Sequence, residues 1–312
     1  MATLKSASSI LLEDAKSYDE RALPQEMVFS ASYLTAFGYL AKAAWDNRDE
    51  IVKAVKTFQS WYNLKKDGVI GPKTMSAMQA PRCGFPDILQ PEYGEHSEAM
   101  ALMEHATANL DKWQKKGLTY YIKSYVGGSL SRSEQEGIIQ GAWNAWNKVC
   151  GINVTRSKSE NSADLIIDTG AGKRSNFDGA GGTLAWAYLP QGANFNDKLL
   201  MRFDLGETWI SNPSARGILM FNVACHEFGH MLGLGHSKKQ GALMAPYYNP
   251  QIAVPQWDDD IPRVESRYGK LISSPTPAPA PTPPSGGGGG EEYFNVRCTK
   301  LEVAGYTLFK NG

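Results

Sequence analysis

Three histidines and one glutamate follow a fixed spacing in the run VACHEFGHMLGLGHS. On a helix, His226 and His230 lie four residues apart and project from one face, where two neutral imidazoles can bind one zinc ion. Glu227 lies beside them and can take a proton from the water that the zinc activates. Gly233 can end the helix and turn the chain back, so that His236 becomes the third ligand. Three protein ligands leave the fourth position open for water, as in a catalytic zinc site.

The extended pattern H-E-x-x-H-x-x-G-x-x-H separates this interpretation from a chance match on an ordinary amphipathic helix. The short form alone would leave that alternative open, but the long form also fixes Gly233 and His236. Met244 follows in the segment LMAP, where a methionine turn beneath the metal is expected. A lone methionine would more often fill a core. The combined spacing therefore predicts a catalytic zinc site.

A second motif lies far from the first along the chain. The zinc motif and Met244 resemble those of metzincins, and the segment PRCGFPD, residues 81–87, is similar to the cysteine-switch motif of matrix metalloproteinases. The resemblance implies that Cys83 takes the fourth zinc position, while Arg82 and Asp87 form an ion pair that holds the segment in shape. Because zinc stabilises a thiolate, and a thiolate displaces the water, the intact chain is expected to be latent.

Activation would require loss of the Cys83 contact and cleavage by an activating protease between about residues 90 and 110, a polar stretch. The resemblance then implies a zinc-dependent endopeptidase that hydrolyses extracellular or matrix proteins. Its mechanism would use Glu227 as the general base. Proteins or peptides are the expected substrates.

The stretch from Ser30 to Gln79 shows apolar residues at helical spacing, which predicts a small helical bundle. Turn residues around Gly68 interrupt the pattern, and Pro72 restarts it. The stretch resembles the peptidoglycan-binding-like domain of the metalloproteinase propeptide, so we expect it to support the inhibitory segment. Two alternatives stay open: a cell-wall-binding protein with a secondary metal domain, and a zinc amidase that acts on peptidoglycan peptides.

The elements that must position the zinc motif can be placed in outline. Ser131-x-x-Glu134 is a capping box that begins a helix, and Asp258 to Tyr268 predicts the last one. Strands are expected at residues 118–125, 152–155, 165–167, 183–188 and 199–203. The predicted fold class is a multidomain α+β protein, with a helical peptidoglycan-binding-like prodomain followed by a metzincin catalytic domain with a twisted mixed sheet and three main helices.

The expected division of the chain has six parts. These are an N-terminal lead-in (1–29), the prodomain (30–80), the cysteine-switch and activation region (81–110), the catalytic domain (111–270), a Pro/Thr/Gly linker (271–290) and a tail too short for a domain (291–312).

A glycine-rich loop and two later acidic residues suit a hard cation such as calcium, because carboxylates and inward-turned carbonyls are its preferred ligands. A solvated turn is the alternative. The resemblance favours structural calcium, with ligands at Asp178, Gly179, Gly181, Thr183, Asp204 and Glu207.

The family also carries a second, structural zinc held by three histidines and an aspartate. The corresponding positions here are Ala171, Lys173, Trp186 and Arg202, which are not zinc ligands, so this zinc is expected to be absent.

Substrate contacts are expected on both sides of the zinc motif. The strand that contains Leu184 and Ala185 is predicted to be an edge strand, which can pair with an extended peptide. Pro246 and Tyr248 resemble the segment that walls the pocket for the side chain after the scissile bond.

Composition limits the other partners. Lys and Arg together number 32 and so do Asp and Glu, so neither nucleic acid nor an anionic membrane surface is an expected partner. The apolar stretches are too short for a membrane span, and the chain is expected to be a monomer. The resemblance implies a secreted protein, although the first residues form no clear signal peptide. A bridge between Cys150 and Cys298 stays open, while Cys225 is expected to be a buried hydrophobe.

Overall fold

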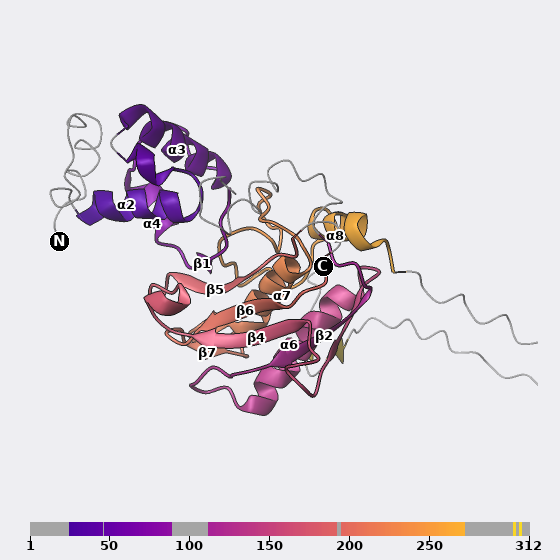
Figure 1. Ribbon diagram of the computed structural model, residues 1–312. Helices are drawn as coiled ribbons and strands as arrows, with labels where there is room; N and C mark the ends of the chain where they lie inside the picture. Colours follow the sequence, from indigo (N-terminus) through magenta and orange to yellow (C-terminus); the bar gives the residue numbers. More distant parts are fainter. Residues whose placement is uncertain are drawn as a thin grey trace, which may run out of the picture.

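A computed structural model of the chain describes residues 25–45, 47–88, 112–191 and 195–271, together with two short pairs of residues near the C-terminus. The expectations for the first part of the lead-in, the activation region, the linker, most of the tail and Cys298 lie outside the described residues. Figure 1 shows a small helical module beside a larger domain of strands and helices, with the segment that contains Cys83 between them.

The N-terminal module contains the helices α2 (Gln25–Ala36), α3 (Arg48–Trp61) and α4 (Pro72–Met78) and the 3-10 helix η1 (Lys42–Ala44). The helix α2 begins before Ser30, where helical residues were expected to start. Its first residues, QEMVF, mix polar and apolar types without a clear helical period. Asn47 caps α3 by accepting hydrogen bonds from two backbone N–H groups, and Pro72 occupies the first turn of α4, where its missing donor costs nothing.

The apolar residues predicted at helical spacing between Ser30 and Gln79 form the core of this module. Aromatic rings meet edge to face around Phe58, which is fully buried. Gln59 lies beside it and hydrogen-bonds with Asp67, Gly68, Val69 and Thr74. One buried amide therefore holds the turn between α3 and α4.

The larger domain is built on one mixed sheet with the strand order β1-β5-β6-β4-β2-β3. All neighbours in it are parallel except β5 and β6, which are antiparallel. The strands are β1 (Arg82–Cys83), β2 (Gly117–Ile122), β3 (Asn153–Arg156), β4 (Leu165–Gly170), β5 (Thr183–Ala187) and β6 (Leu199–Asp204).

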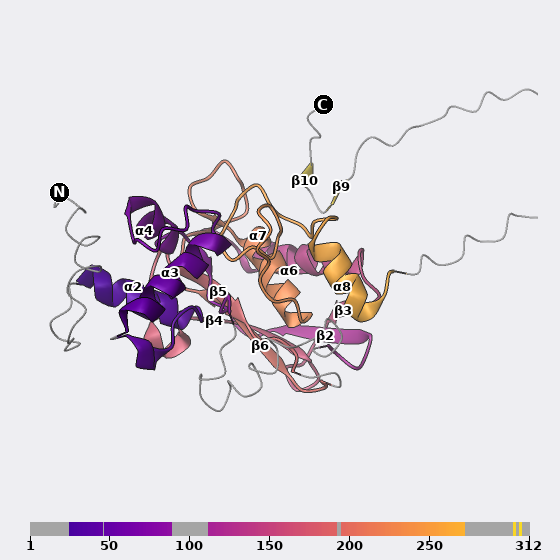
Figure 2. The ribbon, with the colours of Figure 1, turned by 90° about the horizontal axis from the view of Figure 1, so that it is seen from above.

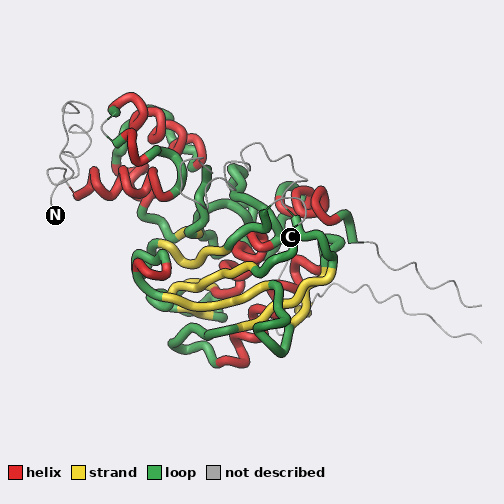
Figure 3. The backbone as a smooth tube through the Cα atoms, viewed as in Figure 1, coloured by secondary structure: helices red, strands yellow, loops and turns green. Residues whose placement is uncertain are grey.

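Two long helices, α6 (Arg132–Asn147) and α7 (Met220–Met231), pack together on one face of this sheet, as Figures 2 and 3 show. The rings of Trp143 and Phe228 stack at 3.8 Å between their centroids and fasten α6 to α7. The helix α8 (Asp260–Tyr268) follows the zinc motif and closes the domain. The prediction of an α+β fold with a mixed sheet and three main helices is confirmed.

The individual elements follow the sequence pattern with small differences at their ends. The capping box is present, since Ser131 and Glu134 bond each other's backbone. The strand β2 ends at Ile122 rather than at residue 125, and β4 runs on to Gly170. The helix α8 begins at Asp260 rather than Asp258.

The remaining short elements are η2 (Lys173–Ser175), β7 (Trp209–Ile210), β8 (Ile218–Leu219), β9 (Glu302–Val303) and β10 (Tyr306–Thr307). Within the described residues, no helix combines the length and apolar character that a membrane crossing needs.

Candidate metal centre

The helix α7 carries the first part of the zinc motif and is buried along almost its whole length. His226, Glu227 and His230 are all at most 8% exposed. Gly233 ends the turn after the helix with a φ of 89°, a left-handed conformation that other residues rarely adopt. The chain then returns and brings His236 beside the first two histidines.

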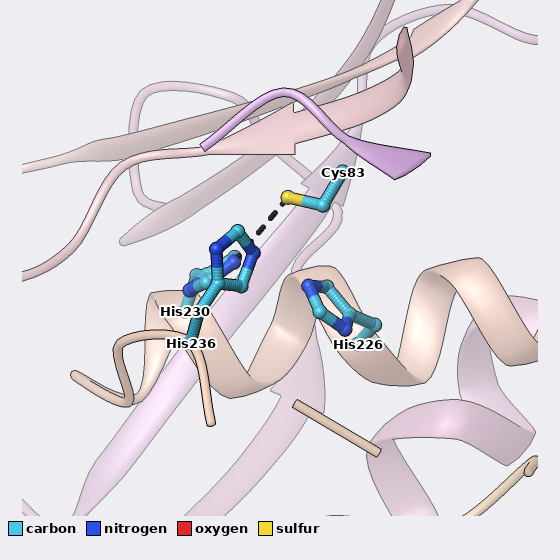
Figure 4. Close-up of side chains that lie close together, drawn as sticks. All are labelled: Cys83, His226, His230 and His236. Atoms are coloured by element: carbon cyan, nitrogen blue, oxygen red, sulfur yellow. Dashed lines mark hydrogen bonds between the residues drawn. The ribbon is translucent and has the colours of Figure 1, made fainter. Parts of the chain in front are cut away.

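The three imidazoles converge on the thiol of Cys83, which comes from β1 (Figure 4). Their ligand atoms and the Cys83 sulfur all lie within 4.8 Å of one another. The Cys83 Sγ atom lies 3.4 Å from His230 Nε2. The structure therefore brings together four residues that the sequence places in two distant motifs.

The orientation of the rings fits a metal ion. The Nδ1 atoms of His226 and His230 lie 2.7 Å from the carbonyl oxygens of Leu243 and Leu234, and these acceptors place the proton on Nδ1. Each Nε2 lone pair is then directed to the centre of the cluster. The Nε2 atoms of His226 and His236 are buried and have no hydrogen-bond partner, a costly state that a cation would relieve.

Burial also sets the charge of the histidines. It lowers the pKa of His226 to about 3 and that of His230 well below its ordinary value. The pKa of His236 is lowered by burial as well. The imidazoles are therefore neutral at pH 7, which is the form that binds a metal.

Glu227 points both carboxylate oxygens into the site without a hydrogen-bond partner. Burial raises the pKa of Glu227 to about 8, within the range useful for a general base. Burial likewise raises the pKa of the Cys83 thiol, so a thiolate at this place requires a cation among the Nε2 atoms.

Met244 lies beneath the cluster and is fully buried. A Cβ on Gly229 of α7 would come within 2.3 Å of the Met244 sulfur, so this close approach requires glycine. Asp260 holds the turn from below, because its carboxylate accepts hydrogen bonds from the N–H groups of Leu243 and Met244. The sequence analysis assigned no such role to Asp260.

The segment around Cys83 lies between β5 and the segment that contains Pro246, and its main chain hydrogen-bonds to both. The N–H groups of Arg82 and Gly84 donate to the carbonyls of Gly182 and Ala185 on the β5 side. On the other side, Cys83 N–H donates to Pro246 O at 2.9 Å. The predicted edge strand β5 is therefore paired with β1.

Arg82 and Asp87 form a buried ion pair of 2.6 Å, the shape-holding pair that the motif predicts. The guanidinium of Arg82 also donates to the hydroxyls of Tyr33 and Tyr62 and lies 3.4 Å from the ring centre of Phe37. From the sequence, Tyr33 and Phe37 are expected only as members of the apolar residues at helical spacing between Ser30 and Gln79. The tyrosine hydroxyl groups were the signal in the sequence that some of these rings hydrogen-bond with a polar partner.

A cavity beside Cys83, His226 and Glu227 includes three of the four predicted substrate-binding residues in its lining, namely Leu184, Pro246 and Tyr248. The fourth, Ala185, lies on β5 and accepts the bond from Gly84. Asn222 also lines the cavity, and its amide donates to the carbonyls of Pro250 and Ile252 in the far wall. That contribution of Asn222 was not predicted.

The three predicted carboxylates lie near the glycine-rich loop, and Asp178 is close enough to add to the effect of burial in raising the pKa of both Asp204 and Glu207. Asp178 accepts a bond from Thr183 N–H, and Glu207 accepts one from Gly181 N–H. Burial and the neighbouring acids raise the pKa of both Asp204 and Glu207. Asp204 Oδ2 is buried without a partner. Calcium at this loop stays a prediction, because among the described residues the cysteine and histidine group at Cys83 is the one whose ligand atoms lie close enough together to hold a metal ion.

Four positions were compared with a second zinc site in the sequence analysis. Two of them, Arg202 and Trp186, make an ion pair, a ring contact and a hydrogen bond instead. Arg202 pairs with Asp168 at 3.2 Å and lies over the ring of Trp186. The indole N–H of Trp186 donates to Ser175 O. The donor set at these positions does not fit zinc.

Comparison with known proteins identifies both parts of the chain. The family model described as Matrixin matches residues 112–269, and one for a peptidoglycan binding domain matches residues 30–78. The chain is 37% identical over 223 residues to matrix metalloproteinase-18 of Xenopus laevis, which covers 69% of this chain and 43% of the relative.

Two further relatives agree with this match. Identity is 34% over 226 residues with the interstitial collagenase of Equus caballus, covering 72% of this chain and 44% of the relative. It is 30% over 267 residues with matrix metalloproteinase-25 of Homo sapiens, covering 80% and 46%. The chain thus spans less than half the length of these relatives.

Proposed function

Because the chain belongs to the matrixin family, we propose that it is a zinc-dependent endopeptidase made as a latent zymogen, which hydrolyses peptide bonds of extracellular or matrix proteins. The observation that carries this proposal is the convergence of three histidine Nε2 atoms and one cysteine sulfur within 4.8 Å. The buried, unpartnered nitrogens of His226 and His236 support it further.

In this proposal, His226, His230 and His236 hold the zinc. A zinc ion bound there supplies a Lewis acid for the scissile carbonyl and lowers the pKa of the attacking water. Glu227 accepts the proton of that water and passes it to the leaving amine. Its two oxygens make no hydrogen bond of good geometry, and the side chain that interacts with them is the Cys83 thiol, which leaves on activation.

The substrate would occupy the place of the segment around Cys83. When that segment leaves, the carbonyls of Gly182, Ala185 and Pro246 lose their partners and can bind the main chain of an extended peptide. The cavity lined by Leu184 and Tyr248 would receive the side chain after the scissile bond.

Latency would rest on Cys83. Its sulfur lies 3.4 Å from His230 Nε2, where it would serve as a fourth ligand to zinc and would exclude the water that Glu227 needs. Activation by another protease would cleave in the polar region between about residues 90 and 110, which lies outside the described residues.

The other expectations from the sequence complete the proposal. A structural calcium would bind at the loop with Asp178, Asp204 and Glu207, and the second zinc of the family would be absent. The mature enzyme would act outside the cell as a monomer. The domain boundaries at residues 30, 81, 111 and 271 also stay predictions.

Replacing Glu227 by Ala tests the chemistry. We expect peptide hydrolysis to fall by about 10²- to 10⁴-fold or more, while zinc content stays unchanged, because Glu227 handles the proton but does not hold the metal. Turnover is measured on a quenched fluorescent peptide after activation, and zinc by elemental analysis. Undiminished cleavage would refute the role of Glu227.

The match of residues 30–78 to a peptidoglycan binding domain favours a second candidate, a wall-binding protein or a zinc amidase of wall peptides. An open groove along α3, whose lining includes Asp49, Lys53, Lys56 and Lys66, would receive the ligand of this second candidate. Retention of the intact chain on insoluble peptidoglycan, together with release of wall peptides, would favour this candidate over the endopeptidase.

A further inference from the structure

The three histidines of the metal centre differ in the group that accepts the hydrogen bond from their Nδ1 atom. His226 and His230 are oriented by backbone carbonyls of their own domain. His236 is oriented by Asp87, because its Nδ1 lies 2.7 Å from Asp87 Oδ1. Neither side chain is exposed at all, so water does not compete for this bond.

The charges of the two groups define the kind of bond. With Asp87 Oδ1 as the acceptor at 2.7 Å, His236 donates its Nδ1–H and leaves the buried Nε2 for a metal. Asp87 also accepts two hydrogen bonds from the Arg82 guanidinium, at 2.6 and 3.1 Å, which is the geometry of an ionised carboxylate paired with a cation. The bond therefore runs from a neutral imidazole to a carboxylate, an arrangement that strengthens a histidine as a metal ligand.

We propose that Asp87 completes the metal centre of the latent chain: its carboxylate orients His236 and increases its affinity for zinc. This inference rests on the proposed function, since it takes zinc as the ion. Asp87 is then a positioning residue for the metal as well as the partner of Arg82. By thermodynamic linkage, zinc strengthens docking of the segment around Cys83, and docking strengthens zinc binding by the same factor.

The hydrogen bonds of Asp87 allow the two roles to be separated. Arg82 reaches both carboxylate oxygens, at 2.6 and 3.1 Å, and Tyr39 donates to Oδ2 at 2.6 Å. His236 bonds only to Oδ1. Replacing Arg82 by Lys or Tyr39 by Phe therefore weakens the support of Asp87 but leaves its carboxylate on His236. Replacing Asp87 by Asn keeps the shape and removes the charge from His236.

The test measures loss of zinc from the full-length, zinc-loaded chain to a chromophoric chelator. We expect D87N to lose zinc about 10- to 100-fold faster than the wild type, as for other removals of a carboxylate behind a histidine ligand. R82K and Y39F should lose it much more slowly than D87N. Equal acceleration by D87N and R82K would overturn the inference, because Asp87 would then act only through the ion pair.

The comparison includes only variants in which the segment stays docked, as shown by a Cys83 thiol that does not react with a thiol reagent. If D87N undocks or fails to fold, histidine nitrogen NMR of the wild-type chain decides instead. The inference predicts that His236 carries its proton on Nδ1, in slow exchange and strongly shifted downfield. A proton on Nε2 or fast exchange at Nδ1 would overturn it.

Failure of this inference and failure of the proposed function give different results. A wild-type chain that takes up no zinc would refute the proposed function. A chain that holds one zinc, but in which D87N behaves like R82K, refutes only the role of Asp87.

Discussion

Arg202 and Asp168 lie directly opposite each other on the neighbouring strands β6 and β4. Side chains in such positions on one face of a sheet interact directly. The pair is completed by Ser124, which donates to Asp168, and by the ring of Trp186 beneath the guanidinium. We infer that these contacts hold the part of the sheet where the family resemblance suggested a second zinc site.

The metal content of the chain tests whether the contacts of Arg202 and Trp186 stand in place of a second zinc. We expect elemental analysis of the purified chain to find one zinc per molecule, because Arg202 and Trp186 offer no lone pair to a metal at neutral pH. A second tightly bound zinc would contradict this expectation.

The Asp168 pair also predicts a dependence of stability on pH. Burial raises the pKa of Asp168, but the hydrogen bonds of Ser124 and Thr169 and the Arg202 contact outweigh it, so the net pKa is lowered from 3.8. An acid whose pKa is lower in the folded state stabilises the fold above its unfolded pKa, and this stability is lost as the pH falls through the folded pKa.

We therefore expect D168N to lower the free energy of unfolding by about 1 kcal/mol at pH 5 to 8, with the difference from wild type shrinking below about pH 4. Urea unfolding at fixed metal concentration measures it. E160Q, which removes an exposed ion pair with Lys123, serves as the control and should change little. A D168N chain as stable as the wild type at pH 7 would refute the role of the pair.

For individual residues, the sequence could predict the zinc motif, because its geometry follows from the period of one helix and one glycine turn. It could not predict the bond between Asp87 and His236, since 149 residues separate them. The same holds for Tyr33 and Tyr62, which bind Arg82 only after α2 and α3 have packed together. The roles of all these residues stay predictions until they are tested.

Among the elements, the strands and helices of the catalytic domain are close to their predicted places. Their signals are local: alternation for β2, and a capping box for α6. The helix α7 has no side-chain cap, so in the sequence it is recognised by the zinc motif and not by a capping residue. The strand β1 has only two residues and exists through its contact with β5, so no local pattern could give its bounds.

The glycine-rich loop leads to a prediction at the scale of an element. If calcium holds Asp178, Asp204 and Glu207 together, removing it leaves three acids in mutual repulsion. We expect EGTA to lower the melting temperature by about 5 to 10 °C relative to calcium at a hundred times its dissociation constant. Differential scanning calorimetry measures the shift.

Two variants separate calcium binding from a general effect of charge. D204N should show no further shift with EGTA, because the buried oxygen without a partner belongs to Asp204. D197N changes an exposed acid outside the loop and should retain the full EGTA effect. If EGTA leaves the wild-type melting temperature unchanged, the loop is a solvated turn.

In the whole molecule, the helical module and the larger domain meet at the segment around Cys83. The module holds Arg82 through its tyrosines, and the larger domain holds the main chain on both sides of Cys83. The segment thus fills the cleft between β5 and the wall at Pro246, and it shields Glu227 and the three histidines.

This arrangement makes latency the central claim. Cleavage of a quenched fluorescent peptide should be measured for the intact chain and for C83S, with zinc content determined for both. The account predicts that both bind zinc, that the intact chain is silent and that C83S cleaves the peptide. It would be contradicted if the intact chain cleaved as fast as C83S, or if both bound zinc and neither cleaved.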